Sequence, residues 1–199
     1  IGYVFQNPFT QISGIKETVF EEIAYGLENF GVSVEEIEKR VIEVMKLTDT
    51  EELAMKNPYE LSGGQMQRVA LASVIVLDPD VLIIDEPTSQ LDPQGTESVF
   101  AIIRKLKEQK KTIILVEHKI DLIAEFTDRV VILKDGEVLK EGDTKSVLTD
   151  ISLLEHGIAI PQIAQLAIQL KEIGLPINSI SVTEDGLLDI LKNLLGERG

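Results

Sequence analysis

The spacing of apolar residues changes several times along the chain, and each change marks a new predicted element. Continuous apolar runs, which are typical of buried strands, occupy residues 1–6, 81–84 and 112–116. Helical spacing occupies residues 62–77, 96–109 and 120–126. Because these predicted strands and helices alternate, we expect a parallel sheet with helices packed against its faces.

A further helical segment is predicted between the first strand and the second. Apolar positions from residue 18 to residue 48 follow the helical period. Ser33 precedes the second part of this segment, and Glu36 follows three residues later, which matches the capping box of a helix start. Residues 18–48 are therefore expected to form two helices.

The last third of the chain has a different pattern. Asp135 and Gly136 lie between the apolar residues 130–133 and 138–139, and Asp-Gly in such a position predicts a β-hairpin. Later in the chain, leucine and isoleucine recur at helical spacing in two stretches. Residues 146–199 are therefore expected to be a C-terminal helical extension.

Composition narrows the classes of protein that fit this pattern. The 199 residues are 44% hydrophobic and 27% charged, which provides enough apolar material for a core. A net charge of −15 repels phosphate backbones, so nucleic acid is not an expected partner. The sequence has no cysteine and only two histidines, which excludes disulfides, cysteine–zinc sites and histidine-rich metal sites.

The residues Leu61-Ser62-Gly63-Gly64-Gln65 stand at the start of a predicted helix. Ser62 and Gln65 match a capping box, which explains only those two residues. Glycine in the first turn costs up to about 1 kcal/mol relative to alanine. Two glycines are explained if an anion must approach the backbone N–H groups at the positive end of the helix dipole. The segment therefore predicts a phosphate-binding site.

Two carboxylates, Asp85 and Glu86, follow the predicted strand at residues 81–84. One interpretation is that the strand simply reaches the surface, where acidic residues cap the next helix. In open α/β sheets, however, ligands bind beyond the carboxyl ends of strands, where these side chains emerge. His118 follows the strand at residues 112–116 in the same way, although a lone histidine is more often structural than catalytic. The pattern predicts metal and water chemistry at this edge of the sheet.

The segment from Leu61 to Gln65 resembles the signature motif of ATP-binding-cassette (ABC) ATPases. Other segments resemble further motifs of that family, in the family's order: the glutamine loop at Gln6, the Walker B strand ending at Asp85 and Glu86, the D-loop with Asp92, and the switch histidine His118. The spacing between the glutamine loop and the signature motif suits a compact helical subdomain.

The resemblance implies a role for each matching residue. Asp85 and Gln6 would hold Mg²⁺, and Glu86 would be the general base that activates the attacking water, assisted by Gln6 and by His118 at the γ-phosphate. Asp92 would take part in communication between two nucleotide sites. The residues implied to bind the ATP of a second subunit are Ser62, Gly63, Gly64 and Gln65. ATP and Mg²⁺ are the implied cofactors.

The implied fold is an α/β, truncated RecA-like P-loop NTPase core with a helical subdomain and a C-terminal helical extension. The expected boundaries are 1–145 for the ATPase domain, with the core at 1–9 and 79–145 and the helical subdomain at about 10–78, and 146–199 for the extension, a candidate dimerisation element. The phosphate-binding loop G-x-x-x-x-G-K-[ST] does not occur in the sequence, and Ile1 lies inside a predicted strand. We therefore expect a fragment whose P-loop lies upstream and which is inactive alone.

Further segments resemble one branch of the family, the energy-coupling-factor and cobalt-type importer ATPases. These segments are residues 6–11, 18–29, 161–166 and 174–176. The resemblance implies an ATP-hydrolysing subunit on the cytoplasmic face of the membrane, paired with an identical or different ABC ATPase and with a transmembrane subunit. It would drive uptake of a vitamin or a transition-metal ion. The alternatives are an ABC ATPase outside transport and a noncatalytic dimer or interaction module.

Overall fold

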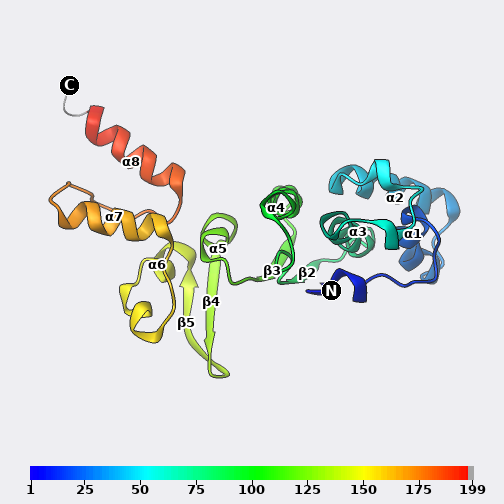
Figure 1. Ribbon diagram of the computed structural model, residues 1–199, viewed down its shortest axis with the longest axis horizontal. Helices are drawn as coiled ribbons and strands as arrows, with labels where there is room; N and C mark the ends of the chain where they lie inside the picture. The colour runs from blue at the N-terminus through cyan, green and yellow to red at the C-terminus, as the bar shows by residue number, and fades with distance from the viewer. Residues whose placement is uncertain (197–199) are drawn as a thin grey trace. The chain divides into compact units, whose positions relative to one another are not determined.

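The computed structural model describes residues 1–196, and the chain divides into two compact units. The first unit is Ile1–Glu117, and the second begins at His118. The first contains the parallel sheet and the helical segment, and the second contains the hairpin and the C-terminal helices (Figure 1). The predicted boundary at residue 145 separates an ATPase domain from a C-terminal extension, whereas the two units meet between residues 117 and 118. The boundary at residue 145 stays a prediction.

The first unit is organised around a three-stranded parallel sheet. Its strands are β1 (Gly2–Val4), β2 (Val81–Asp85) and β3 (Thr112–Val116), in the order β1-β2-β3. Val4 pairs with Ile84, and Asp85 pairs with Val116. The predicted parallel sheet is therefore confirmed, and its register brings the ends of β1 and β3 to either side of the end of β2.

Two helices that follow the motif residues pack in this unit. They are α3 (Gly63–Ile75) and α4 (Pro93–Glu108), and α3 contacts both β1 and α4. Helix α4 begins three residues earlier than predicted, because the Asp92 carboxylate accepts the N–H of Gly95 at 2.7 Å. Leu82 and Ile84, on alternate positions of β2, are buried.

The helical segment consists of α1 (Val19–Asn29) and α2 (Val34–Thr48), which pack with α3 around one core. Three short 3₁₀ turns complete it, at Pro8–Thr10, Glu51–Leu53 and Pro58–Glu60. Both predicted helices are confirmed. The core residues that are fully enclosed include Val19, Ile23, Val41, Leu53, Met66 and Val69.

The capping box predicted at Ser33 is only half formed. The Ser33 hydroxyl accepts the Glu36 N–H at 3.4 Å, but the Glu36 carboxylate bonds to Nε of Arg40 at 2.7 Å. The cation one turn along the helix competes for this carboxylate, and this i, i+4 ion pair replaces the reciprocal bond. A complete capping box instead starts α1, between Thr18 and Glu21.

The second unit contains α5 (Ile120–Phe126) and a two-stranded antiparallel sheet of β4 (Arg129–Lys134) and β5 (Glu137–Asp143). Asp135 and Gly136 have φ angles of 52° and 82°, the left-handed conformation that a tight hairpin turn requires. The predicted hairpin is confirmed. Strand β5 was predicted to end at residue 139 but continues to Asp143. Its polar residues after residue 139 still pair with β4, and the last pair is Arg129↔Asp143.

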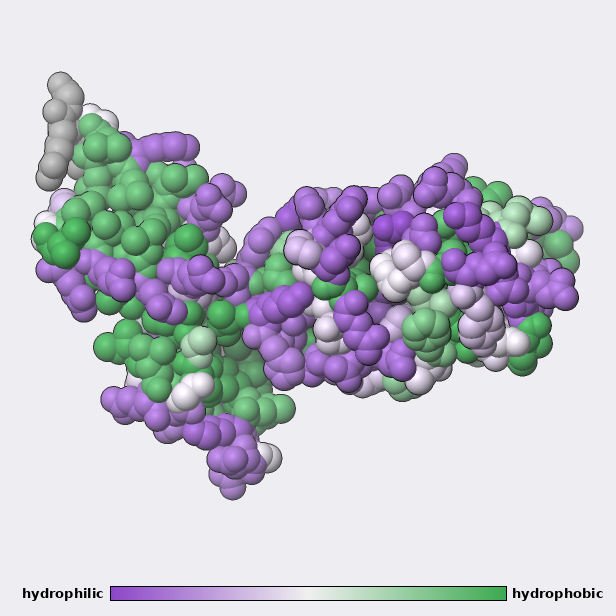
Figure 2. All heavy atoms as spheres, in the orientation of Figure 1, coloured by the Kyte–Doolittle hydropathy of each residue, from purple (hydrophilic) through white to green (hydrophobic). Residues whose placement is uncertain are grey.

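The remaining described part of the second unit, up to Gly196, is mainly helical, and the two predicted helical stretches are confirmed. It comprises α6 (Thr144–Leu148), a 3₁₀ helix (Ile151–His156), α7 (Gln162–Glu172) and α8 (Glu184–Gly196). Figure 2 shows apolar side chains gathered over α7 and α8, where Leu166, Ile173, Leu188 and Leu195 are exposed. Within residues 1–196, no helix combines the length and the apolar character needed to cross a bilayer.

Candidate functional site

The two predicted carboxylates stand where β2 ends. Asp85 is the last residue of the strand, and Glu86 follows it with a φ of 40°, in the left-handed region. This conformation costs a residue with a side chain about 1–3 kcal/mol, and such strain is concentrated at functional sites. The Glu86 N–H donates to the Val116 carbonyl at 2.9 Å, which holds the turn against β3. The backbone therefore changes direction between the two carboxylates, as the end of a strand permits.

Each carboxylate receives a hydrogen bond from the segment at β1. The Tyr3 hydroxyl donates to Oδ2 of Asp85, and Nε2 of Gln6 donates to Oε2 of Glu86, both at 2.7 Å. Because the Tyr3 hydroxyl donates a hydrogen bond to the Asp85 carboxylate, the pKa of Tyr3 is raised above its usual value. Four side chains from two distant segments therefore form one cluster, which we call the carboxylate cluster: Tyr3, Gln6, Asp85 and Glu86.

Tyr3 was not among the predicted site residues. It lies in an apolar run and resembles a core residue in the sequence. The signal that reveals it is the strand register: Tyr3 pairs with Ile83, and Asp85 lies two residues beyond Ile83 on the same face of the sheet. That register depends on pairing between strands about eighty residues apart, so the local pattern does not contain it.

The helix start predicted after Ser62 is formed, and its phosphate-binding role stays a prediction. The Ser62 hydroxyl accepts the Gln65 N–H at 3.4 Å, and the Gln65 side chain accepts the Ser62 N–H at 3.1 Å, which confirms this capping box. Beyond the adjacent residues and the backbone of α3 itself, a Cβ at Gly63 would contact no described atom within 4 Å, and one at Gly64 would contact only the Cα of Gly95, at 3.7 Å. Packing therefore does not require either glycine, and Gly63 faces open space.

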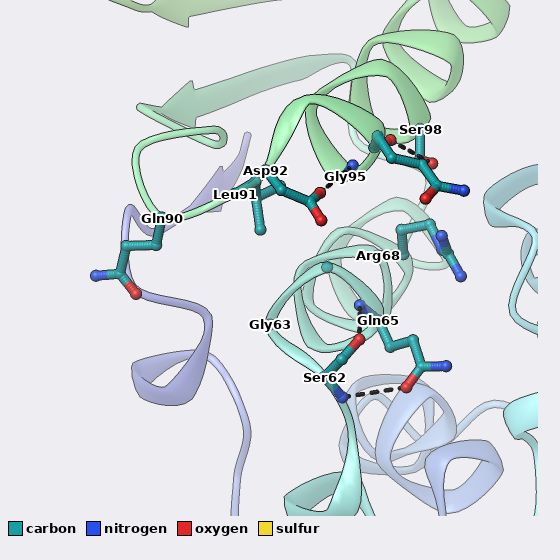
Figure 3. A pocket seen from close by; sticks show the side chains of 11 residues that line it. Ser62, Gly63, Gln65, Arg68, Gln90, Leu91, Asp92, Gly95 and Ser98 are labelled. Atoms are coloured by element: carbon teal, nitrogen blue, oxygen red, sulfur yellow. Dashed lines mark hydrogen bonds between the residues drawn. The ribbon is translucent and has the colours of Figure 1, made fainter.

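The signature segment and the D-loop line one pocket of about 500 Å³, shown in Figure 3. We call it the signature pocket; its lining includes residues 62–65, Arg68, residues 90–92 and Ser98. Asp92 faces the pocket and also caps α4, so its side chain already has a structural role. The described lining includes none of Gln6, Asp85 and Glu86, so the carboxylate cluster and the signature pocket are separate.

The residue before His118 is tied to the turn after β2. Thr88 is 1% exposed, and its hydroxyl donates to Oε2 of Glu117 at 2.9 Å. Neither residue was predicted from the sequence, since their contact joins positions that are distant in the chain. His118 itself is the first residue of the second unit, and its predicted contact with the γ-phosphate stays a prediction.

The carboxylate cluster has the donor atoms that Mg²⁺ prefers. The Asp85 carboxylate and the Gln6 amide oxygen are hard oxygen ligands, and proteins hold Mg²⁺ with one or two carboxylates supplemented by substrate phosphates and water. No group of three His, Cys, Asp or Glu side chains in the described part of the chain could hold a metal alone. The Asp85 carboxylate and the Gln6 amide oxygen fit a Mg²⁺ ion whose other ligands are phosphate or water oxygens.

Comparisons with known proteins agree with these motifs. A family model described as ABC transporter matches residues 1–89. The energy-coupling factor transporter ATP-binding protein EcfA2 of Streptococcus pyogenes serotype M5 (strain Manfredo) is 41% identical over 195 residues, which cover 97% of this chain and 69% of that protein. The EcfA2 of serotype M1 has the same identity and coverage.

Two solved structures are also similar. The chain matches cbiO1 from Clostridium perfringens, part of the ABC transporter complex cbiONQ, with a TM-score of 0.69 and 36% identity, over 83% of this chain and 66% of that one. It matches the ABC cassette MJ0796, a dimer bound to ADP and Pi, with a TM-score of 0.62 and 36% identity, over 72% and 62% of the two chains. The chain thus spans about two thirds of the length of the relatives that it matches.

Proposed function

The chain belongs to the ATP-binding-cassette (ABC) family of transporter ATPases, and on this premise we propose that the complete protein hydrolyses ATP to drive an importer of the energy-coupling-factor or cobalt type. The observation that carries the proposal is the carboxylate cluster, in which Gln6 holds the Glu86 carboxylate beside Asp85. An orienting amide on one carboxylate and a neighbouring carboxylate for a cation suit the hydrolysis of a phosphoanhydride.

Glu86 is the general base in this proposal. Its carboxylate takes a proton from water while the water oxygen attacks the γ-phosphorus and ADP leaves. The amide of Gln6, at 2.7 Å, fixes the rotation of that carboxylate before the substrate arrives. Mg²⁺, held by Asp85 and Gln6, would supply charge neutralisation at the phosphates. His118 would contact the γ-phosphate.

The signature pocket completes the site of a second subunit in this proposal. One chain carries a carboxylate cluster and a separate pocket that opens at the start of α3. The absence of side chains at Gly63 and Gly64, together with the helix dipole, suits an anion supplied by another copy or by a different ABC ATPase. Two subunits would then form two sites, each sharing residues of both, with Asp92 of the D-loop between them.

The names of its relatives support a membrane role for the protein. EcfA2 is named as a transporter ATP-binding protein, and cbiO1 is described as part of a transporter complex. We accordingly assign this protein to the cytoplasmic face of a membrane, bound peripherally to a transmembrane subunit. The cargo in this assignment is a vitamin or a transition-metal ion.

Phosphate release from ATP by the complete protein tests the proposal. The complete protein is the right material, because these 199 residues contain no G-x-x-x-x-G-K-[ST] segment. We expect turnover with Mg²⁺, loss of turnover with a chelator, and stimulation by co-expression with a transmembrane subunit. If ATP binds to the complete protein and no phosphate is released under any of these conditions, the protein is an interaction module and the proposal is wrong.

A further inference from the structure

Strand β1 carries one hydroxyl in an otherwise apolar sequence. Tyr3 sits opposite Ile83 in the parallel ladder, so its ring lies on the face of the sheet that also carries Asp85. Two residues along a strand amount to about 6.6 Å, a distance that a tyrosine side chain spans. The Tyr3 hydroxyl accordingly reaches Oδ2 of Asp85 at 2.7 Å.

The ring of Tyr3 makes a packing contact that does not involve its hydroxyl. Phe5 lies two residues further on, just beyond β1, and the two ring centroids are 4.9 Å apart with an interplanar angle of 56°. Such tilted aromatic pairs are favourable in themselves. Removal of the hydroxyl alone therefore leaves the ring in place, and the hydroxyl has a role that packing does not explain.

A carboxylate at the end of a strand can rotate about its last bond, because that torsion is broad and roughly two-fold. A donor on one oxygen fixes the rotation and leaves the lone pairs of the other oxygen for a ligand. The phenol–carboxylate bond is charge-assisted, which makes it stronger than a bond between neutral groups. In metal sites, partners of this kind orient the ligand, and their removal typically weakens metal binding 10–100-fold.

We propose that Tyr3 is a positioning residue for Asp85: its hydroxyl holds Oδ2 so that the other carboxylate oxygen faces the divalent cation of a bound nucleotide. This inference rests on the proposed function, which supplies the cation and the nucleotide. Within the carboxylate cluster, Tyr3 orients Asp85 as Gln6 orients Glu86, so β1 and the loop after it prepare both acidic groups.

The test measures binding of Mn²⁺, a paramagnetic substitute for Mg²⁺, to the complete protein with a nonhydrolysable ATP analogue. Free Mn²⁺ is followed by electron paramagnetic resonance, so the readout does not depend on turnover. For Tyr3→Phe we expect Mn²⁺ binding roughly tenfold weaker than in the wild type. Affinity for the analogue in the presence of a chelator should not change. Tyr59→Phe, which removes an exposed hydroxyl in the helical segment, is the matched control and should bind Mn²⁺ normally.

A double-mutant cycle separates positioning from a general loss of structure. If Tyr3 acts through the Asp85 carboxylate, Tyr3→Phe should have no further effect on Mn²⁺ binding in an Asp85→Asn background. The proposal is overturned if Tyr3→Phe binds Mn²⁺ as tightly as the wild type or more tightly, or if it causes the same loss in the Asp85→Asn background. Failure of the wild type to bind Mn²⁺ with the analogue would instead contradict the proposed function.

Discussion

At the end of β2 the side chains bond to partners 80 and 82 positions away, whereas at the start of α3 the side-chain bonds of Ser62 and Gln65 each span three positions. The carboxylate cluster therefore exists only when the sheet has its native register. The helix start of the signature pocket is specified locally and needs only the helix. The carboxylate cluster thus depends on the tertiary fold, whereas the helix start in the signature pocket depends on residues that are close together in the sequence.

The two halves also differ in what remains available to a ligand. In the carboxylate cluster, each acidic group accepts a hydrogen bond, one from Tyr3 in β1 and one from Gln6 in the loop after it. In the signature pocket, Ser62 and Gln65 form the capping box with each other's backbone N–H groups. Gly63 and Gly64 place no side chain over the start of α3. Chemistry that needs a base at a defined angle suits the first half, and recognition of an anion suits the second.

The largest expected effect is that of Glu86→Gln, which alters the carboxylate cluster and leaves the signature pocket intact. Glutamine keeps the shape and can still accept from Gln6, but it cannot take a proton at neutral pH. We expect phosphate release to fall about 10²–10⁴-fold with ATP binding retained, measured by steady-state turnover and equilibrium binding. Glu137→Gln, on the exposed hairpin, is the control. Normal turnover in Glu86→Gln would remove Glu86 from the role of base.

Ser62→Arg acts on the other half. The substitution places bulk and charge at the start of α3, which faces the phosphate in the proposed function. It should therefore impair the ATP site that contains the carboxylate cluster of the partner subunit. A dimer with one variant chain should lose about half or more of its turnover, because one site lacks its phosphate-facing donors. Dimers isolated with two affinity tags allow this measurement. Ser33→Arg removes the cap of α2 and serves as the control; full activity in the mixed Ser62→Arg dimer would contradict the shared site.

Thr88→Val tests how firmly the turn after β2 is attached to β3. Valine has the same shape but cannot donate to the Glu117 carboxylate. The free energy of unfolding should fall by about 1–2 kcal/mol, since a part-buried carboxylate loses a hydrogen-bond donor. Urea unfolding measures this change. Thr149→Val, which breaks only a local bond to the Lys145 carbonyl, should cost less. Equal free energies of unfolding in the two variants would show that the Thr88–Glu117 bond contributes no more to stability than a local bond.

The smallest expected effect is on stability in Gly63→Ala. Because the added methyl group meets no described atom within 4 Å, alanine should stabilise α3 by up to about 1 kcal/mol. ATP turnover should nevertheless fall, because the methyl group covers the backbone that an anion must approach. Thermal unfolding and phosphate release measure the two effects. Gly31→Ala, at a φ of 69°, should be destabilised instead. Unchanged turnover in Gly63→Ala would contradict a phosphate-binding role.

Features with short-range causes were predictable from the sequence. The period of apolar residues identified β2, β3 and α5, and Asp-Gly identified the hairpin turn. The cap at Ser62 was recognised for the same reason, since its partner Gln65 is three residues away. The same kind of signal overpredicted the box at Ser33, because Arg40 offered Glu36 a competing partner.

Local patterns in the sequence therefore predicted the main strands and helices, the capping box at Ser62 and the family. Only the tertiary structure decided which side chains meet: Tyr3 with Asp85, Gln6 with Glu86, and Thr88 with Glu117. The physical reason is that helical spacing, turns and caps arise among residues a few positions apart. Strand register, by contrast, arises from burial and pairing between segments about eighty residues apart, and the bond between Tyr3 and the Asp85 carboxylate depends on that register.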